Sequence, residues 1–186
     1  MQHADHVRLI ERGIERGRGG VWADLGSGGG AFTLALRDLA GPEVEICSVD
    51  RDAGSLRVQQ AQMERQFPGT TLRVLAEDFT QSLPLPLLDG IVAANSIHYV
   101  RDRAVLLRGW RRYLKPAGRL ILIEYDSGEG NRWVPYPVSF ASLPRLAGTA
   151  GYASPELLRT YPSRFLDGMY AALLRPVAPE PDAEVS

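Results

Sequence analysis

The sequence predicts an α/β domain, with a mostly parallel sheet that has helices on both faces. Three features predict this class. Short apolar runs alternate with segments of helical periodicity, the connections between them are short, and glycine or proline marks most of the turns. Strands that alternate with helices in this way form parallel sheets covered on both faces.

The composition fits one globular domain. The 186 residues are 45% hydrophobic and 23% charged, and the formal net charge is −1. A chain this close to neutral has no overall field that would attract nucleic acid or an anionic membrane. Cys47 is the only cysteine, so neither an internal disulfide nor a zinc site built from cysteines can form. The chain has no apolar run long enough to span a membrane and no signal-peptide pattern, which predicts a cytoplasmic protein.

The apolar patterns place the elements in order. Val7, Ile10 and Ile14 share one face of a first helix over 4–16. Further helices are expected at 30–40, 52–67 and 103–114. Buried strands are expected at 21–25, 44–50, 71–78, 90–96 and 119–125, with a turn at 115–118 before the last of them.

The pattern changes after the fifth strand. Residues 127–138, rich in glycine, proline and aromatic residues, are expected to form a loop, and 139–152 a helix. Two strands around a turn are expected over 154–176. The acidic, proline-rich residues 177–186 are expected to be a disordered tail, which leaves one domain over 1–176.

The segment "DLGSGGG", Asp24 to Gly30, follows the first strand and opens the second helix. Glycine weakens regular structure and is used where the backbone needs a positive φ or a ligand comes very close. At such a point the backbone N–H groups and the positive end of the helix converge on a ligand. Two ligands suit the site: a dinucleotide, through its pyrophosphate, and S-adenosylmethionine, through its carboxylate. The spacing Gly26-x-Gly28-x-x-Ala31 also fits the dinucleotide pattern, so the loop alone leaves both open.

Acidic residues at the ends of three strands favour S-adenosylmethionine. Asp24 precedes the loop, where an acid suits a ligand with an ammonium group or can orient the N–H groups of the loop. Asp50 ends the second strand, where a carboxylate can accept hydrogen bonds from both ribose hydroxyls of either ligand. Asp78 and Phe79 follow the third strand and can contact the amino group and the ring face of adenine. The carboxyl ends of parallel strands share one edge of the sheet, which is where ligands bind.

Taken in order, these motifs resemble the class I S-adenosylmethionine-dependent methyltransferases over residues 5–175. The resemblance is carried by "VWADLGSGGGAFT", "CSVDRD", "AEDFTQSLPLPLLDGIVAANSIHYV", "LKPAGRLILIEY" and the "AGY" of 150–152. It implies a Rossmann-like three-layer sandwich of seven strands in the order 3-2-1-4-5-7-6, with only the seventh strand antiparallel. The two strands expected at the C-terminal end agree with that order.

The resemblance also implies which residues bind the cofactor. Asp50 would bind the ribose, with Arg51 beside it in the site, Asp78 and Phe79 would contact the adenine, and Asn95 would face the sulfonium. The residues that would line the methionine end are Asp24, Gly26, Gly28 and Gly30, and Ser27 of the same loop would be a further cofactor-binding residue. Trp22 departs from the branched aliphatic residue usual in the family and is expected in the core.

His98 follows the fourth strand, at the edge where an acceptor would meet the methyl group, and it is the candidate catalytic residue. Three roles are open to it: a general base, a substrate contact or a structural residue. Glu124, Tyr125 and Tyr99 share this edge and are weaker candidates. The loop over 127–138 is the candidate lid of the site.

The predicted function is direct transfer of a methyl group from S-adenosylmethionine to an oxygen, nitrogen or carbon atom of a small molecule. The fourth strand ends in "ANSIHY" and lacks the Asn-Pro-Pro-Tyr-like motif of many members that methylate nucleic acids, so no nucleic-acid partner is predicted. No membrane partner and no metal are predicted, and a homodimer that completes the thinly covered site is a candidate assembly. Two other functions stay open: a non-catalytic S-adenosylmethionine-binding protein and, less favoured, an NAD(P)-dependent oxidoreductase.

Overall fold

The computed structural model describes residues 1–163, 166 and 168–177. Its strands are β1 (Gly20–Leu25), β2 (Val44–Val49), β3 (Thr71–Leu75), β4 (Leu88–Ala94), β5 (Leu114–Tyr125), β6 (Glu156–Tyr161) and β7 (Met169–Leu174). Its α-helices are α1 (His3–Ile10), α2 (Ala31–Ala40), α3 (Ala53–Gln66), α4 (Arg103–Arg111) and α5 (Leu143–Ala150). Two single 3₁₀ turns are η1 (Glu11–Gly13) and η2 (Ile97–Tyr99).

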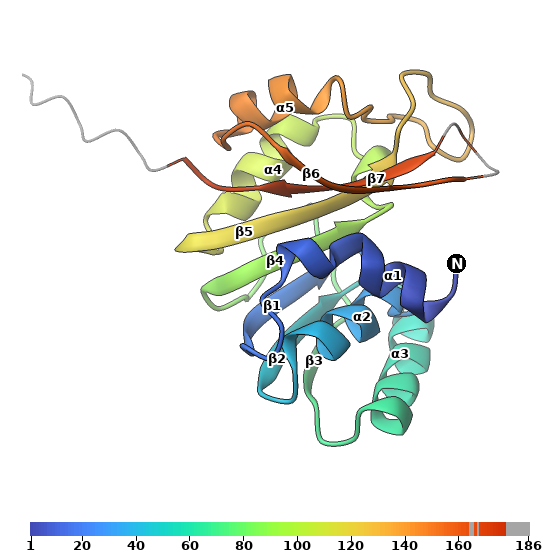
Figure 1. Cartoon of the computed structure of the whole chain (residues 1–186), viewed down its shortest axis with the longest axis vertical. Coiled ribbons are helices and arrows are strands. Elements are labelled where there is room, and N and C mark those ends of the chain that lie inside the picture. Colours follow the sequence, from blue (N-terminus) through green and yellow to red (C-terminus); the bar gives the residue numbers. More distant parts are fainter. Residues whose placement is uncertain (164–165, 167, 178–186) are drawn as a thin grey trace, which may run out of the picture.

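The strands form one sheet in the order β3-β2-β1-β4-β5-β7-β6 (Figure 1). The first five strands pair in parallel, whereas β7 runs antiparallel to β5 and to β6. The predicted fold class, strand order and single reversed strand are therefore confirmed. Since the parallel strands share a direction, the segments that follow β1, β2, β3 and β4 meet at one edge of the sheet.

Helices cover both faces of the sheet, each over its own apolar core. One core lies between the sheet and α1, α2 and α3, and the other lies between the sheet and α4 and α5. Side chains alternate between the two faces, as a buried strand requires. On β4, Val92 faces the first core, while Ile91 and Ala93 face the second. Figure 1 shows α4 and α5 together on their side of the sheet.

Several element boundaries differ from the sequence prediction. The first helix ends at Ile10 and continues as η1, where Gly13 packs so closely that a Cβ would lie 2.8 Å from Cδ1 of Ile121. Strand β3 ends at Leu75, so Asp78 lies in the following loop. The predicted turn at 115–118 lies within the bounds of β5, but the pairing with β4 jumps from Leu114 to Arg119 and leaves these four residues out of register.

The C-terminal segment is described up to Val177, which was expected to begin the tail. The Val177 N–H donates to the carbonyl of Gly151 (3.1 Å), and Arg111 donates to the Val177 carbonyl (2.6 Å). The remaining residues of the predicted tail, 178–186, lie outside the described residues. Among the helices that the structure does describe, none has both the length and the apolar character needed to cross a membrane.

Trp22 lies in the core, as expected, and is 4% exposed. It is paired with Gly90 across β1 and β4, and its ring covers the glycine: a Cβ built on Gly90 would lie 2.2 Å from Cζ3 of the indole. The indole of Trp22 therefore fits in the core only because Gly90 on the neighbouring strand has no side chain.

Replacing Gly90 with alanine is expected to lower the free energy of unfolding by about 2–3 kcal/mol, because the added methyl group must displace the indole or shift a central strand. Unfolding in urea measures the effect. Trp22→Leu alone should also destabilise the fold, since it leaves a cavity. The double variant is expected to lose less stability than the two single changes summed, and strict additivity would show that the two residues do not constrain each other.

Candidate active site

The glycine loop joins β1 to α2 and is held by β2. The N–H groups of Gly26 and Ser27 donate to the carbonyl of Val49 (2.9 and 3.1 Å), and that of Gly28 donates to Oδ2 of Asp50 (2.8 Å). The loop is therefore fixed by main-chain and carboxylate hydrogen bonds from the neighbouring strand.

Three of the loop glycines have a positive φ: 79° at Gly26, 50° at Gly28 and 85° at Gly30. Two of these also have no room for a side chain. A Cβ on Gly26 would lie 2.5 Å from Cβ of Ser96, and one on Gly30 would lie 2.3 Å from Cγ of Gln59. Gly29 is different, because its φ lies outside the left-handed region and no atom lies within 4 Å of its built Cβ. The loop thus needs glycine both for its backbone shape and for close packing.

The contrast between Gly30 and Gly29 gives a matched pair of variants. Gly30→Ala is expected to destabilise the fold by about 2 kcal/mol, through left-handed strain and the contact with Gln59. Gly29→Ala should leave the free energy of unfolding within about 0.5 kcal/mol of the wild type. Chemical unfolding of both variants checks the prediction, and equal losses would contradict it.

A chain of buried polar side chains lies beneath the loop. Oγ of Ser48 lies 2.7 Å from Oγ of Ser27 and 2.8 Å from Oε1 of Gln59. The Gln59 amide donates to Oγ1 of Thr33 (2.5 Å), and the Thr33 hydroxyl donates to Oδ2 of Asp24 (2.6 Å). The chain links β2, α3 and α2 to β1, so it fixes the elements that frame the loop.

Ser48, Gln59 and Thr33 are not among the site residues predicted from the sequence. A signal for Gln59 was available, because Leu56, Gln59 and Met63 are the buried residues of α3 and share a helical face. A polar residue in an apolar stripe indicates a buried hydrogen-bond partner.

Asp24 is 1% exposed, and its carboxylate faces Thr33. Burial raises its pKa to about 7, against the opposing effect of the hydrogen bond from Thr33. The side chain does not line the main cavity. Any effect of Asp24 on a ligand would therefore act through Thr33 and the loop.

The main cavity has a volume of about 580 Å³ and lies at the carboxyl edge of the sheet, a size within the usual range for small-molecule sites. Six of the predicted cofactor residues line it: Gly26, Asp50, Arg51, Asp78, Phe79 and Asn95. The predicted residues that do not line it are Asp24, Ser27, Gly28 and Gly30. Its further lining residues are Glu77, Thr80, Ser96, Tyr99 and Val100, which are sequence neighbours of the predicted ones.

The acids of the cavity are held in place by main-chain groups. Oδ1 of Asp50 accepts from the N–H of Asp52 (2.9 Å), while its other oxygen accepts from Gly28. Oδ1 of Asp78 accepts from the N–H of Thr80 (2.8 Å), and hydrogen bonds from Thr80 hold the pKa of Asp78 below its usual value. Each carboxylate oxygen has a second lone-pair site, so both acids can still accept hydrogen bonds from a ligand.

The ring of Phe79 closes the cavity from the side of α4. It meets Trp110 edge to face with centroids 5.9 Å apart, and the indole N–H donates to the Phe79 carbonyl (3.3 Å). A ring fixed in this way offers a flat apolar wall to a planar ligand.

Asn95 directly follows β4 and is strained. Its φ is 52°, and within the described part of the chain its buried Oδ1 has no hydrogen-bond partner. Left-handed backbone and an unsatisfied buried oxygen both cost free energy and occur together at functional sites. Asn95 lines the main cavity and also a second one beside it.

The second cavity measures about 290 Å³ and is lined by Asn95, His98, Tyr99, Tyr125, Trp133 and Val134. Its polar centre is a buried pair: Nδ1 of His98 lies 2.6 Å from Oε2 of Glu124, and the two side chains are 2% and 0% exposed. The other carboxylate oxygen of Glu124 accepts from the N–H of Ile97 (3.1 Å). Glu124 therefore holds both the His98 ring and the η2 turn that carries it.

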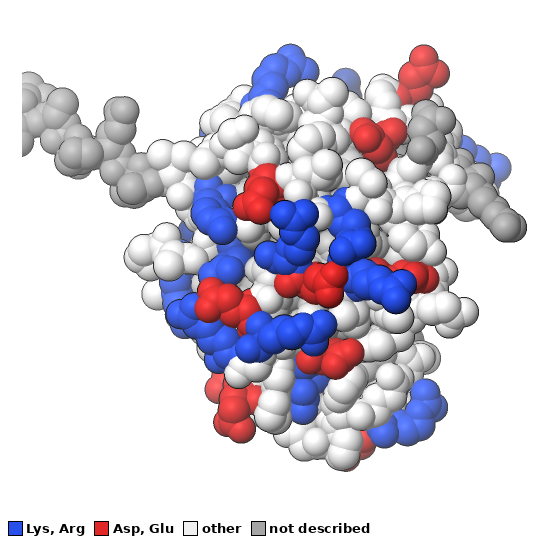
Figure 2. Space-filling view, viewed as in Figure 1, with Lys and Arg blue, Asp and Glu red and all other residues white. Residues whose placement is uncertain are grey.

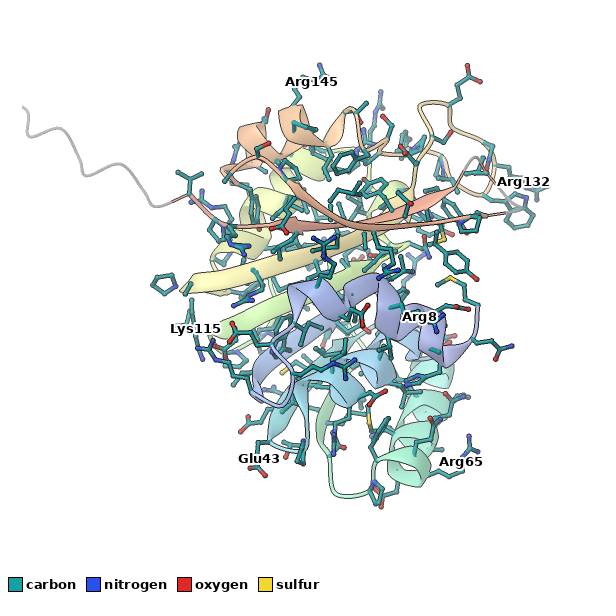
Figure 3. The ribbon with its side chains drawn as sticks, viewed as in Figure 1. Arg8, Glu43, Arg65, Lys115, Arg132 and Arg145 are labelled. Carbon is teal, nitrogen blue, oxygen red and sulfur yellow. The ribbon has the colours of Figure 1, made fainter. Side chains whose placement is uncertain are left out.

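The loop over 127–138 covers this second cavity. The N–H of Tyr136 donates to the His98 carbonyl (3.0 Å), and Arg103 donates to the carbonyls of Tyr136 and Pro137. Val134 is buried, whereas Trp133 is 62% exposed at the rim. Figure 3 shows Arg132 of this loop at one end of the molecule, opposite Lys115 and Glu43.

A glycine cradle and an acidic cavity at the switch point of a doubly wound sheet define a nucleoside-binding α/β protein. A family model described as a methyltransferase domain matches residues 23–122. The chain belongs to this family, and the resemblance found in its sequence is confirmed.

Two curated relatives and one solved structure illustrate the match. The ubiquinone/menaquinone biosynthesis C-methyltransferase of Pasteurella multocida is 31% identical over 106 residues, which are 55% of this chain and 39% of the relative. The release factor glutamine methyltransferase of Bordetella pertussis is 30% identical over 127 residues, 68% of this chain and 41% of the relative. The chain thus spans less than half the length of either.

The structure of the Burkholderia thailandensis 1,6-didemethyltoxoflavin-N1-methyltransferase, with bound 1,6-didemethyltoxoflavin and S-adenosylhomocysteine, superposes with a TM-score of 0.74 at 17% identity. The match covers 93% of this chain and 79% of the other. It supports the fold over nearly the whole chain. Within the described residues, no group of three or more His, Cys, Asp or Glu side chains is placed to hold a metal ion.

Proposed function

We propose that this chain is an S-adenosylmethionine-dependent methyltransferase that acts on a small molecule. The observation that carries the proposal is that the two cavities adjoin. Asn95 and Tyr99 each line both the main cavity and the second cavity. The larger cavity, with the glycine loop and Asp50, would hold the methyl donor, and the smaller one would hold the acceptor. A methyl group crossing from one to the other would pass the unsatisfied oxygen of Asn95.

The charge of the larger cavity favours this cofactor over NAD(P). Asp50, Glu77 and Asp78 line it against a single cation, Arg51. S-adenosylmethionine carries an ammonium and a sulfonium group, whereas a dinucleotide would bring a doubly charged pyrophosphate beside these carboxylates. The oxidoreductase alternative is therefore disfavoured.

When bound, the cofactor supplies an activated methyl group on a good leaving group. The chain then has to orient the acceptor and exclude water, and orientation alone can supply roughly 7–11 kcal/mol of the barrier. Asp50 and Phe79 would fix the nucleoside end of the donor, Asn95 would face its sulfonium, and the loop over 127–138 would shield the acceptor. His98 lines only the acceptor cavity.

The partner and location predictions stay predictions. Figure 2 shows acidic and basic side chains intermixed on one face of the molecule, without a basic stripe there, which supports a function without nucleic acid. The homodimer and the cytoplasmic location rest on the sequence.

The test is methyl transfer from radiolabelled S-adenosylmethionine to a panel of hydroxyl, amino and carbon acceptors, with a glutamine-containing peptide included because one relative is a glutamine methyltransferase. Labelled product from a small acceptor supports the proposal. Labelled peptide alone would move the substrate class to protein. Cofactor binding without any product would favour the non-catalytic alternative.

A further inference from the structure

The acceptor cavity has a distinct chemistry. None of its six lining residues is an acid, a lysine or an arginine, and three of them are the aromatic residues Tyr99, Tyr125 and Trp133. At about 290 Å³ it lies at the small end of ligand sites. It therefore suits an uncharged planar molecule of one or two rings, held by aromatic contacts.

The His98–Glu124 pair gives this cavity a proton acceptor. Since Glu124 faces Nδ1, the hydrogen bond places the ring proton on Nδ1 and leaves the Nε2 lone pair available. Among the described residues, none forms a hydrogen bond with Nε2. Tyr99 and Tyr125 flank the imidazole, with ring centroids 4.3 and 6.0 Å away.

We infer that the acceptor is an aromatic hydroxyl compound, that His98 is the general base for it, and that Glu124 is a positioning residue for His98. The inference rests on the proposed function and extends it to a substrate class.

In the step, the phenolic proton passes to Nε2 of His98, which becomes an imidazolium stabilised by the Glu124 carboxylate. The oxygen lone pair forms the new bond to the methyl carbon. At the same time the methyl–sulfur bond breaks, and the electron pair of that bond stays on sulfur. Products are a methyl aryl ether, a neutral thioether and a proton, which His98 later returns to water.

Other acceptors fit this cavity less well. An alkylamine enters as a cation, and no carboxylate lines the cavity to pair with it, because Glu124 is 0% exposed and lies outside the lining. An aliphatic alcohol is a much weaker acid than a phenol, so a histidine removes its proton far less readily.

The test compares phenol, catechol, para-nitrophenol and benzylamine as acceptors for the full chain. His98→Gln is expected to lower kcat for phenol and catechol by about 10²–10⁴-fold, with KM little changed. Glu124→Gln should lower kcat for these phenols by about 10-fold or more, because Glu124 positions His98 and stabilises its protonated form. Para-nitrophenol is already largely ionised in mildly alkaline buffer, so it needs no base and should lose less than about 10-fold in either variant.

A second readout does not depend on turnover. In mildly acidic buffer with S-adenosylhomocysteine present, the wild type is expected to bind para-nitrophenol as its anion, which the nitrophenolate absorbance reports. The His98→Gln variant is expected to show no such absorbance. His3→Gln is the matched control, because His3 is partly exposed on α1, pairs with Asp38 and lines neither cavity. Calorimetric binding of S-adenosylhomocysteine and thermal unfolding show that each variant is folded.

Equal losses for phenol and para-nitrophenol in His98→Gln, with no absorbance change on binding in the wild type, would overturn the inference. Methylation of benzylamine but of no phenol would also overturn it, while leaving the proposed function standing. Binding of S-adenosylhomocysteine by a wild type that methylates no acceptor at all would overturn both.

Discussion

Asp50→Ala is expected to weaken the binding of S-adenosylhomocysteine by about 10²–10³-fold, equivalent to roughly 3–4 kcal/mol. The loss has two sources. The carboxylate fixes the glycine loop through Gly28 and the start of α3 through Asp52. It also lines the main cavity, where it would accept the ribose hydroxyls. Isothermal titration calorimetry measures the change in affinity.

Glu43→Ala is the matched control, because Glu43 is exposed before β2, at the opposite end of the strand, and lines neither cavity. Asp50→Asn separates the two sources of the loss, since it keeps the shape of the side chain but removes the charge. Its affinity should fall between those of the wild type and Asp50→Ala. An Asp50→Ala protein that is folded and binds within a few-fold of the wild type would show that the ligand does not use this carboxylate.

The second large effect is a pH dependence of stability centred on Asp24. Burial raises the pKa of the folded Asp24 to about 7, above its usual value of 3.8. An acid with a raised folded pKa stabilises the fold below the unfolded pKa, and this stabilisation is lost as the pH rises through the folded pKa. At about 1.4 kcal/mol for each pKa unit, the free energy of unfolding is expected to fall by roughly 4 kcal/mol between pH 4 and pH 8 on account of this one group.

Asp24→Asn should remove that slope, because the amide does not ionise. The variant is therefore expected to gain stability over the wild type as the pH rises, as measured by urea unfolding at a series of pH values. Glu64→Gln, which replaces an exposed acid on α3, is the comparison and should leave the slope unchanged. Parallel curves for the wild type and Asp24→Asn would mean that Asp24 ionises as readily in the folded protein as in the unfolded chain.

Much of the fold and part of the site could be predicted because their signals are local. A buried strand followed by a glycine loop and a helix fixes where a ligand meets the backbone, and an acid after the next strand lies at the same edge. Asp50 and Asp78 were expected at that edge on this basis, and Asn95 was implied by the family resemblance; all three line the main cavity.

The side-chain contacts that were not predicted join residues on different helices and strands, so they depend on where each side chain points in the folded chain. Asp24 lies two residues after Trp22, so strand alternation turns both toward the same layer of helices, and Asp24 meets Thr33 of α2. Gln59 joins this network from α3; its place in the buried stripe of the helix indicates a hydrogen-bond partner but does not specify that the partner is Thr33. Glu124 and His98 were both assigned to the carboxyl edge. Their direct pairing depends on how η2 turns after β4, which the sequence does not reveal.

We expect the glycine loop and the acidic cavity to bind S-adenosylmethionine. Isothermal titration of the wild type with S-adenosylhomocysteine, and separately with NAD, tests it most directly. We expect saturable binding of one S-adenosylhomocysteine for each chain and no binding of NAD. Binding of NAD without binding of S-adenosylhomocysteine would contradict it and make "DLGSGGG" a pyrophosphate loop.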